Sequence, residues 1–352
     1  MEVHQILPTL SYGDAVSNDA INIRKVLVKN GIKSEIYAKF IHPDVSQYAK
    51  PLKYYKKDFR NIVLYHFSLA GDDVTEFIKN LPEKKGLIYH NITPPRFFDN
   101  YDPTLSELCR KGLLELKTMA PYILIGIGDS EYNRIDLENS GFTKTGVLPI
   151  LINFDNFDQK RLCDNQLRND TINVLFVGRI APNKKFEDLI KIFYYFNKSI
   201  NQKSQLILVG DKQVPKYYAD LQKLVLNLNL TDDVFFVGSV KDDELSSYYK
   251  NADIFLCMSE HEGFCVPLLE AMYHDIPIIA YNATAVPYTL GNSGVLINKK
   301  DYIQIAELMN IIIEDKKLRE RIVTKQRERL SDFAIEKSAE KLLGLIHDLS
   351  TL

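Results

Sequence analysis

The sequence predicts an α/β protein built from two doubly wound parallel sheets. Short apolar runs alternate with amphipathic helical stretches along the 352 residues, which is the pattern of repeated β-α-β units. A chain of this length can bury two separate cores. A polar, unpatterned stretch from Asn153 to Asp170 interrupts the pattern. We therefore expect one domain over 1–160, a second over 161–332, and a final amphipathic helix within 333–352.

The expected elements follow the same alternation in both halves. Strands are expected at Val3–Leu7, Lys33–Ala38, Ile62–Tyr65, Lys85–Tyr89 and Tyr122–Gly126, and then at Asn173–Val177, Gln205–Val209, Val234–Val237, Ile254–Met258, Ile278–Ala280 and Gly294–Leu296. Helices are expected at Asn18–Asn30, Asp73–Lys79 and Thr104–Thr118, and then at Phe186–Ser199, Lys216–Leu226, Asp242–Tyr249, Pro267–Tyr273, Tyr302–Asp315 and Phe333–Ile346.

Composition narrows the class of protein. The formal net charge is −2 and the basic residues are dispersed, so nucleic-acid binding is not expected. The four cysteines form no CxxC pair, which predicts neither a zinc framework nor disulfides and fits a reduced, cytosolic setting. The amino terminus does not read as a leader, and the apolar runs are too short to cross a bilayer. We therefore expect any membrane association to be peripheral.

The most informative motif is Glu262-Gly-Phe-Cys-Val-Pro-Leu-Leu-Glu270, which follows a buried apolar run. Pro267 suits the first turn of a helix, where a missing N–H costs nothing. The turn before this helix would aim free backbone N–H groups at a bound anion. Glu262 at the turn and Glu270 inside the helix could then hold hydroxyl groups on either side of a diphosphate, as a nucleotide-sugar requires.

With its flanking residues, this motif resembles the Glu-x7-Glu signature of retaining GT-B glycosyltransferases of the GT4 type. The Gly-Phe after the first glutamate, the Pro-Leu-Leu before the second and the following Asp275-Ile-Pro-Ile-Ile-Ala280 carry the resemblance. It implies the GT-B fold, in which two Rossmann-like domains flank a cleft. It also implies that the last helix, 333–352, packs back on the first domain.

A second motif, Gly178-Arg179-Ile-Ala-Pro-Asn-Lys184, ends the first strand of the second half and looks like the Gly-Arg-x4-Lys loop of the same family. The resemblance implies that Arg179 and Lys184 neutralise the donor diphosphate. Two fixed cations there would stabilise the leaving group most as the glycosidic bond breaks. Lys185 stands where the family usually has glycine, so the sequence leaves open which lysine acts.

Two other strands of the second half end in glycine, at Gly210 and Gly238. Ligands of open α/β sheets bind at the carboxyl ends of strands, so Gly210 and the turn from Gly238 to Val240 could meet the nucleotide base. They could equally serve only as tight turns. A dinucleotide-binding fingerprint is not expected, because Gly126-Ile-Gly128 lacks a third glycine and follows a fifth strand rather than the first.

In the first half, Gly13 matches a glycine of the family's loop across the cleft from the diphosphate. Asp14 could bind sugar or acceptor hydroxyls or cap a helix. The resemblance implies that His90, at a strand end, contacts the transferred sugar or the phosphate; a structural hydrogen-bonded histidine is the alternative, as for His66. Other polar side chains follow the next strand and could line the acceptor side: Asp129, Ser130 and Glu131.

By resemblance, Glu262 holds sugar hydroxyls, Glu270 holds the ribose, and the amides of Gly263, Phe264 and Cys265 hold diphosphate oxygens. Cys265 occupies a place where glycine is frequent. The family is usually described by a front-face route in which the leaving phosphate takes the acceptor proton. The sequence contains no Asp-x-Asp, so we expect no required metal and no cofactor.

We therefore predict a retaining hexosyltransferase that uses GDP-mannose or a UDP-hexose and a glycan or lipid-linked glycan acceptor, in the assembly of bacterial surface polysaccharide or O-antigen. The alternatives are a nucleotide-sugar epimerase or hydrolase on the same fold, or a non-catalytic subunit that binds a partner transferase. The segment Tyr48–Arg60 is rich in lysine and tyrosine and could touch an anionic membrane, although it could also be a solvated loop.

Overall fold

The structure is a computed structural model that describes residues 1–154 and 170–352. The chain forms two compact units. The first consists of Met1–Pro95, Thr104–Asn153 and Phe333–Leu352, and the second of Arg96–Pro103 and Phe154–Asp332. The expected boundary between residues 160 and 161, and most of the expected linker, lie outside the described residues. No helix among the described residues is both long and apolar enough to span a membrane.

The first unit contains a seven-stranded sheet in which every pair of neighbours is parallel. The strands are β1 (Val3–Leu10), β2 (Ile36–Ile41), β3 (Ala49–Pro51), β4 (Ile62–Phe67), β5 (Lys84–Tyr89), β6 (Ile125–Gly128) and β7 (Thr145–Val147). Their order is β3-β2-β1-β4-β5-β6-β7. The order reverses between β1 and β4, and a doubly wound sheet opens a crevice at such a point.

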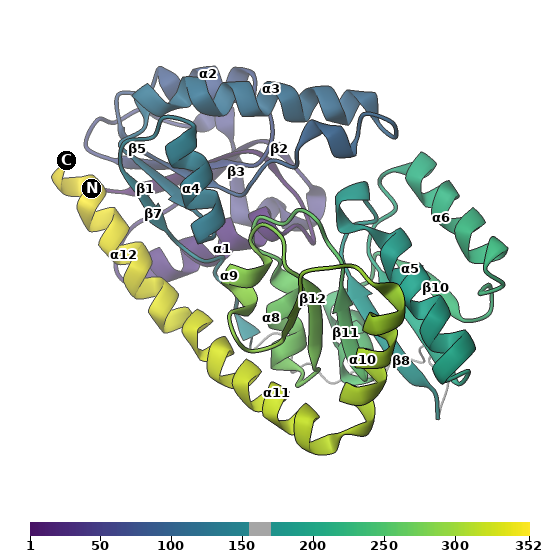
Figure 1. Cartoon of the computed structure of the whole chain (residues 1–352). Coiled ribbons are helices and arrows are strands. Elements are labelled where there is room, and N and C mark those ends of the chain that lie inside the picture. The colour runs from purple at the N-terminus through teal and green to yellow at the C-terminus, as the bar shows by residue number, and fades with distance from the viewer. Residues whose placement is uncertain (155–169) are drawn as a thin grey trace. The chain divides into compact units, whose positions relative to one another are not determined.

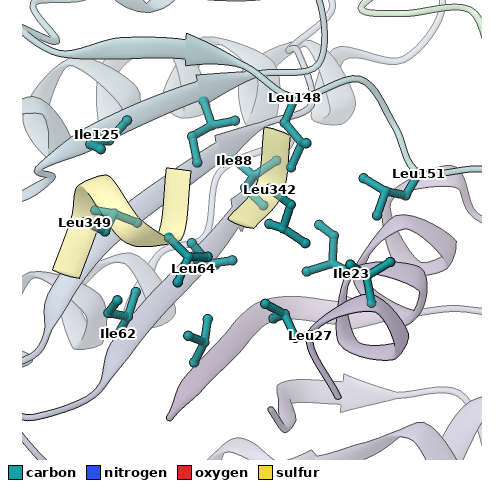
Figure 2. Packing of buried hydrophobic residues seen from close by; sticks show 14 residues of the cluster. Ile23, Leu27, Ile62, Leu64, Ile88, Ile125, Leu148, Leu151, Leu342 and Leu349 are labelled. Carbon is teal, nitrogen blue, oxygen red and sulfur yellow. The ribbon is translucent and has the colours of Figure 1, made fainter. Parts of the chain in front are cut away.

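Helices of the first unit cover this sheet. They are α1 (Ala15–Lys29), α2 (Asp73–Lys79), α3 (Pro103–Met119), α4 (Glu131–Asn139) and α12 (Ile335–Thr351). The C-terminal helix α12, yellow in Figure 1, contacts α1, β4 and β5. Figure 2 shows Leu342 and Leu349 of α12 among buried side chains of the sheet and α1, including Ile62, Leu64 and Ile23. Burial of these side chains fixes α12 to the first unit although it is last in the sequence.

The second unit contains a six-stranded parallel sheet with the same winding. The strands are β8 (Ile172–Val177), β9 (Ser204–Val209), β10 (Val234–Gly238), β11 (Ile254–Cys257), β12 (Ile278–Tyr281) and β13 (Val295–Ile297). Their order, β10-β9-β8-β11-β12-β13, reverses between β8 and β11. Two doubly wound parallel sheets confirm the predicted fold class.

The helices of the second unit alternate with its strands. They are α5 (Phe186–Tyr195), α6 (Pro215–Asn227), α7 (Asp242–Lys250), α8 (Val266–Tyr273), α9 (Val286–Leu290), α10 (Tyr302–Glu314) and α11 (Lys316–Leu330). Helix α5 runs on as a π-helical turn, Phe196–Ile200, and packs beside α10 (Figure 1). The largest fully buried side chains of this unit are aromatic: Phe176, Phe186, Phe193, Phe196, Tyr249 and Phe255.

Several elements differ from the sequence prediction for identifiable reasons. Strand β6 begins at Ile125, so Gly126 and Gly128 lie within it, whereas the prediction began this strand at Tyr122. Helix α11 was not predicted, because its buried face holds only Ile322, Val323 and the polar Gln326. The Gln326 amide nitrogen donates to the Ile276 carbonyl at 2.7 Å, and its oxygen accepts from the Ile278 N–H at 3.1 Å. Apolar periodicity cannot detect a helix that docks through an amide.

Truncation of Leu342 to alanine should destabilise the first unit, because this fully buried side chain joins α12 to the sheet. The expected loss is about 2–5 kcal/mol of the free energy of unfolding. Urea denaturation of Leu342→Ala and of the exposed neighbour variant Lys341→Ala measures the difference. Equal stability of the two variants would show that α12 is not held by this core.

Candidate active site

The loops that follow β8 and β11 meet where the order of the second sheet reverses. The backbone N–H of Glu260, after β11, donates to the carbonyl of Asn183, after β8, at 2.8 Å. The Asn183 side-chain amide donates back to the His261 carbonyl at 3.0 Å. Asn183 is buried, so these bonds are shielded from water. The two loops are therefore fixed to each other at the point where doubly wound sheets bind ligands.

An ion pair between Lys184 and Glu262 is the central feature of this point. Lys184 Nζ lies 2.5 Å from Glu262 Oε2, and the two side chains are 17% and 6% exposed. The backbone N–H of Glu262 donates to Thr284 Oγ1 at 2.8 Å, which fixes the residue from the loop after β12. The other carboxylate oxygen, Glu262 Oε1, is buried and has no hydrogen-bond partner among the described residues. A buried acceptor of this kind is suited to a hydroxyl donor supplied by a ligand.

Two residues of these loops adopt left-handed backbone conformations although neither is glycine. Lys185 has φ of 55° before α5, and Cys265 has φ of 72° before α8. Glycine adopts such values without strain, whereas other residues pay roughly 1–2 kcal/mol. Both are the places where the sequence suggested a family glycine. Lys185 Nζ pairs with Glu187 at 2.6 Å, so the lysine that contacts Glu262 is Lys184.

Arg179 and Glu270 form hydrogen bonds with residues other than Lys184 and Glu262. Arg179 is exposed, and its Nη1 donates to the Gln213 amide oxygen at 3.4 Å. Glu270 lies inside α8, where its Oε2 accepts from the Tyr249 hydroxyl of α7 at 2.6 Å. Burial raises the pKa of Glu270 to about 7, against the lowering effect of the Tyr249 hydrogen bond. Near neutral pH this carboxyl can therefore donate or accept a hydrogen bond.

The glycines at the strand ends have distinct roles. A side chain on Gly210 would place Cβ 2.0 Å from the Gly178 carbonyl oxygen, so glycine is required for the close approach of these two backbones. Gly238 has φ of 89° and accepts a hydrogen bond from the Gly210 N–H at 2.9 Å. Val240 is half-buried beyond it. Gly263 is half-buried, whereas Phe264 is buried and its carbonyl accepts from the Thr289 hydroxyl.

In the first unit, His90 belongs to a buried hydrogen-bonded chain. The Gln5 amide nitrogen donates to the Ala20 carbonyl, so its oxygen is left to accept from His66 Nε2 at 2.8 Å. Burial lowers the pKa of His66 well below its usual value, so its Nδ1 accepts from His90 Nε2 at 2.8 Å. His90 Nδ1 then shares a proton with Asp129 Oδ2 at 2.9 Å. Both ring nitrogens of His90 are thus engaged within this unit, and its side chain is 1% exposed.

The charges around His90 are unusual for a buried site. Burial lowers the pKa of His90, but the charge and hydrogen bond of Asp129 outweigh burial, so the net pKa is raised. Asp19 is also buried, which raises its pKa to about 7, and it accepts from the Leu151 N–H at 2.8 Å. Asp129 Oδ1 has no hydrogen-bond partner among the described residues. The His90–Asp129 pair can therefore hold a proton between His90 Nδ1 and Asp129 Oδ2.

The other polar residues predicted near this edge have structural partners. Asp14 caps α1 by accepting from the Ser17 N–H at 3.1 Å, and Gly13 before it has φ of 69°. Ser130 caps α4 by accepting from the Asn133 N–H at 3.2 Å. Glu131 pairs with Arg134 at 2.6 Å. For Asp14, the structure supports the capping role of the two considered.

Sequence reasoning missed a second charged network, which includes Glu260, two residues before Glu262. Lys300 Nζ lies 2.7 Å from Asp188 Oδ2 and 2.9 Å from Glu260 Oε1, and the Tyr302 hydroxyl donates to Asp188 at 2.8 Å. Lys300 and Asp188 are 13% and 5% exposed, so their pair is shielded, whereas Glu260 is 37% exposed. These four residues come from three segments that are remote in sequence, and they match no motif. Only the winding of the sheet brings them together.

The fold is that of GT-B glycosyltransferases, and comparison with known proteins agrees. Residues 159–329 match the family described as glycosyl transferases group 1. Residues 159–329 thus belong to that family, which confirms the resemblance to glycosyltransferases. The GT4 type and the retaining chemistry stay predictions.

Three similar proteins illustrate the relationship. A Campylobacter jejuni α-1,4-N-acetyl-D-galactosaminyltransferase acting on a diNAcBac-PP-undecaprenol glycan is 25% identical over 57% of this chain and 54% of its own. The Staphylococcus aureus capsular polysaccharide biosynthesis glycosyltransferase CapM is 30% identical over 48% of this chain and 43% of its own. Each match thus spans about half of the relative. The structure of Anabaena Alr3699/HepE in complex with UDP-glucose superposes with a TM-score of 0.78 at 15% identity, over 99% of this chain and 100% of that chain.

The buried Glu270 carboxyl predicts a pH-dependent stability. Its folded pKa of about 7 lies above the ordinary 4.5, so the folded state binds more protons between these values and loses stability as the pH rises through them. Glu270→Gln keeps an acceptor for Tyr249 but cannot ionise. At roughly 1.4 kcal/mol per pKa unit, the stability of the natural protein relative to Glu270→Gln should fall by on the order of 3 kcal/mol between pH 4.5 and pH 7. Chemical denaturation across this range measures it; a constant difference would contradict the raised pKa.

Proposed function

We propose that this protein is a retaining glycosyltransferase that moves a hexosyl unit from a nucleotide-diphosphate sugar to a glycan or lipid-linked glycan. The observation that carries the proposal is the Lys184–Glu262 pair at the reversal point of the second sheet, with Glu262 Oε1 buried and unpartnered. A cation for the diphosphate and an acceptor for sugar hydroxyls are thereby held side by side. Such a pair matches the two ends of a nucleotide-sugar at its scissile bond.

Catalysis then depends on charge and position. Lys184, together with the exposed Arg179, stabilises the charge that grows on the leaving diphosphate, and that stabilisation is larger in the transition state than in the ground state. Glu262 orients the sugar through its hydroxyls, and Glu270 binds the ribose. The bond to the diphosphate breaks and the acceptor oxygen bonds to the anomeric carbon on the same face, so the configuration is retained. The leaving phosphate takes the acceptor proton. We propose that this chemistry requires no metal and no further cofactor.

We propose that the donor is either GDP-mannose or a UDP-hexose. The glycine turns after β9 and β10 offer backbone groups to the base, and such contacts carry no side-chain signature. Anabaena Alr3699/HepE was solved with UDP-glucose, which favours testing UDP-sugars first. Similarity to the capsular polysaccharide glycosyltransferase CapM supports a role in the assembly of surface polysaccharide, and similarity to the Campylobacter enzyme supports a lipid-linked glycan as acceptor.

Two other functions are tested alongside transfer. A nucleotide-sugar epimerase or hydrolase would act on the donor without an acceptor, and the buried His90–Asp129 pair is the acid–base group that such an enzyme could use. A non-catalytic subunit would bind a nucleotide or a partner but turn nothing over. Incubation of donor with and without glycan acceptors separates the three, and NMR of the product gives the anomeric configuration.

Replacement of Lys184 and Arg179 by alanine should strongly weaken binding of the free nucleotide. Loss of each hydrogen bond to a charged group is worth about 1.5–3 kcal/mol, so affinity should fall by at least about tenfold per residue. Calorimetric titration with UDP and with GDP measures the effect and chooses the base. Glu270→Ala should also weaken binding if Glu270 holds the ribose.

Lys185→Gly is the matched control for Lys184→Ala. It removes a neighbouring positive charge, and glycine suits the φ of 55°. Nucleotide affinity should therefore stay close to that of the natural protein. Glu262→Gln should likewise retain nucleotide affinity but lose sugar transfer. Unchanged binding in the Lys184 and Arg179 variants would refute the donor site.

Segment Tyr48–Arg60 supports a peripheral contact with an anionic lipid surface. Tyr54 and Phe59 are 61% and 72% exposed, and the lysines beside them, Lys53, Lys56 and Lys57, are also exposed. Aromatic side chains at the interface and nearby lysines are the features that anionic bilayers attract.

Reversal of these three lysines to glutamate should abolish co-sedimentation with vesicles that contain phosphatidylglycerol. An equal charge change on exposed residues of α11, Lys316, Lys317 and Lys325, should have a smaller effect. Vesicles of phosphatidylcholine alone should bind neither protein. Equal loss in both triple variants would show that net charge alone, rather than this segment, governs binding.

A further inference from the structure

Two buried thiols lie close to the Glu262 carboxylate. Cys257 is the last residue of β11, and Cys265 immediately precedes α8; their exposed fractions are 0% and 5%. The two Sγ atoms and a carboxylate oxygen of Glu262 all lie within 4.8 Å of one another. All three residues belong to one strand–loop–helix segment, so the strand end and the helix start hold the group together.

The separations suit a tetrahedral cation. Zinc binds thiolate sulfur at about 2.3 Å and carboxylate oxygen at about 2.0–2.2 Å, which sets tetrahedral ligand atoms roughly 3.5–3.8 Å apart. Thiolates favour zinc, cadmium and cobalt over magnesium, which prefers oxygen ligands. A fourth ligand can come from water or from Ser259, whose Oγ lies 3.5 Å from Cys257 Sγ.

An independent observation points to a ligand at the same place. Glu262 is 5% exposed, and its Oε1 has no hydrogen-bond partner among the described residues, while Oε2 is paired with Lys184. By contrast, Asp19, His66 and His90 of the first unit also cluster within 4.8 Å, but every ring nitrogen of the two histidines is hydrogen-bonded. The thiol cluster is the one that offers a free ligand atom.

We propose that Cys257, Glu262 and Cys265 form a binding site for a thiophilic divalent cation of the zinc class. Binding replaces two S–H bonds by two metal–sulfur bonds and releases two protons, so affinity rises with pH. The bound cation holds the carboxylate that sugar hydroxyls would otherwise use. On the proposed function, which this last step requires, the cation competes with the nucleotide-sugar but not with the free nucleotide, and so inhibits transfer.

The site itself is tested by spectroscopy, which requires no activity. The protein is reduced, freed of reductant, and titrated with Co²⁺, whose thiolate charge-transfer and tetrahedral visible absorption report on the ligands. Cys163, outside the described residues, is replaced by serine in every sample. Cys257→Ala and Cys265→Gly each remove one thiolate, and glycine suits the φ of 72° at residue 265. The control is Cys109→Ala, which removes a buried thiol of the first unit.

We expect one Co²⁺ per chain with both absorption signatures, displaced by Zn²⁺ and unaffected by excess Mg²⁺. Affinity should fall by more than about tenfold in each of the two variants and stay unchanged in the control. Absence of thiolate absorption in the reduced protein, or equal binding by Cys257→Ala, overturns the site.

The competition is tested separately by nucleotide-sugar titration with and without Zn²⁺. In the presence of Zn²⁺, affinity for the nucleotide-sugar should fall while affinity for the free nucleotide stays. Cys257→Ala should be insensitive to Zn²⁺. If Zn²⁺ also weakens nucleotide-sugar binding by Cys257→Ala, the inhibition arises at another site and the proposed competition is wrong. Failure of the natural protein to bind any nucleotide-sugar refutes the proposed function but leaves the cobalt result standing.

Discussion

The reversal of strand order between β8 and β11 is the constraint on which the second unit's site depends. Neighbouring parallel strands end at the same edge of the sheet. The connections that follow β8 and β11 run in opposite directions from this edge, so a crevice opens between them. The chain fills this edge with two loops joined through Asn183 and with the ion pair of Lys184 and Glu262. A pair so shielded is costly unless both charges stay matched. The site therefore needs two motifs, one after β8 that supplies Lys184 and one after β11 that supplies Glu262.

The sequence predicted the parts of the fold whose signal is local. Apolar runs located most strands, and the fold class followed from their alternation with helices. The short edge strands β3 and β7 have no such run, and α11 docks through Gln326 rather than through an apolar stripe. Periodicity records burial of apolar side chains, so elements held by hydrogen bonds or by three residues of backbone pairing leave no trace in it.

The sequence predicted those site residues that belong to local motifs. Lys184 and Glu262 were identified from their motifs, and the structure brings them together. Their distance, the role of Thr284 and the Lys300–Asp188 network could not be derived, because each joins loops that are remote in sequence. Asp14 and His90 show the converse. Their residue types suit a ligand, yet the structure gives Asp14 a helix cap and encloses His90 between His66 and Asp129.

Arg96–Pro103 belongs to the second unit and the C-terminal helix to the first, which limits how the protein can be divided into fragments. Followed from end to end, the chain passes between the two units four times, after Pro95, Pro103, Asn153 and Asp332. No single cut can therefore release either unit whole. A fragment ending near the middle lacks α12, and its first sheet would expose the apolar surface that Leu342 and Leu349 cover. Separate expression of the halves thus invites aggregation through that uncovered face, whereas co-expressed fragments retain the means to reassemble.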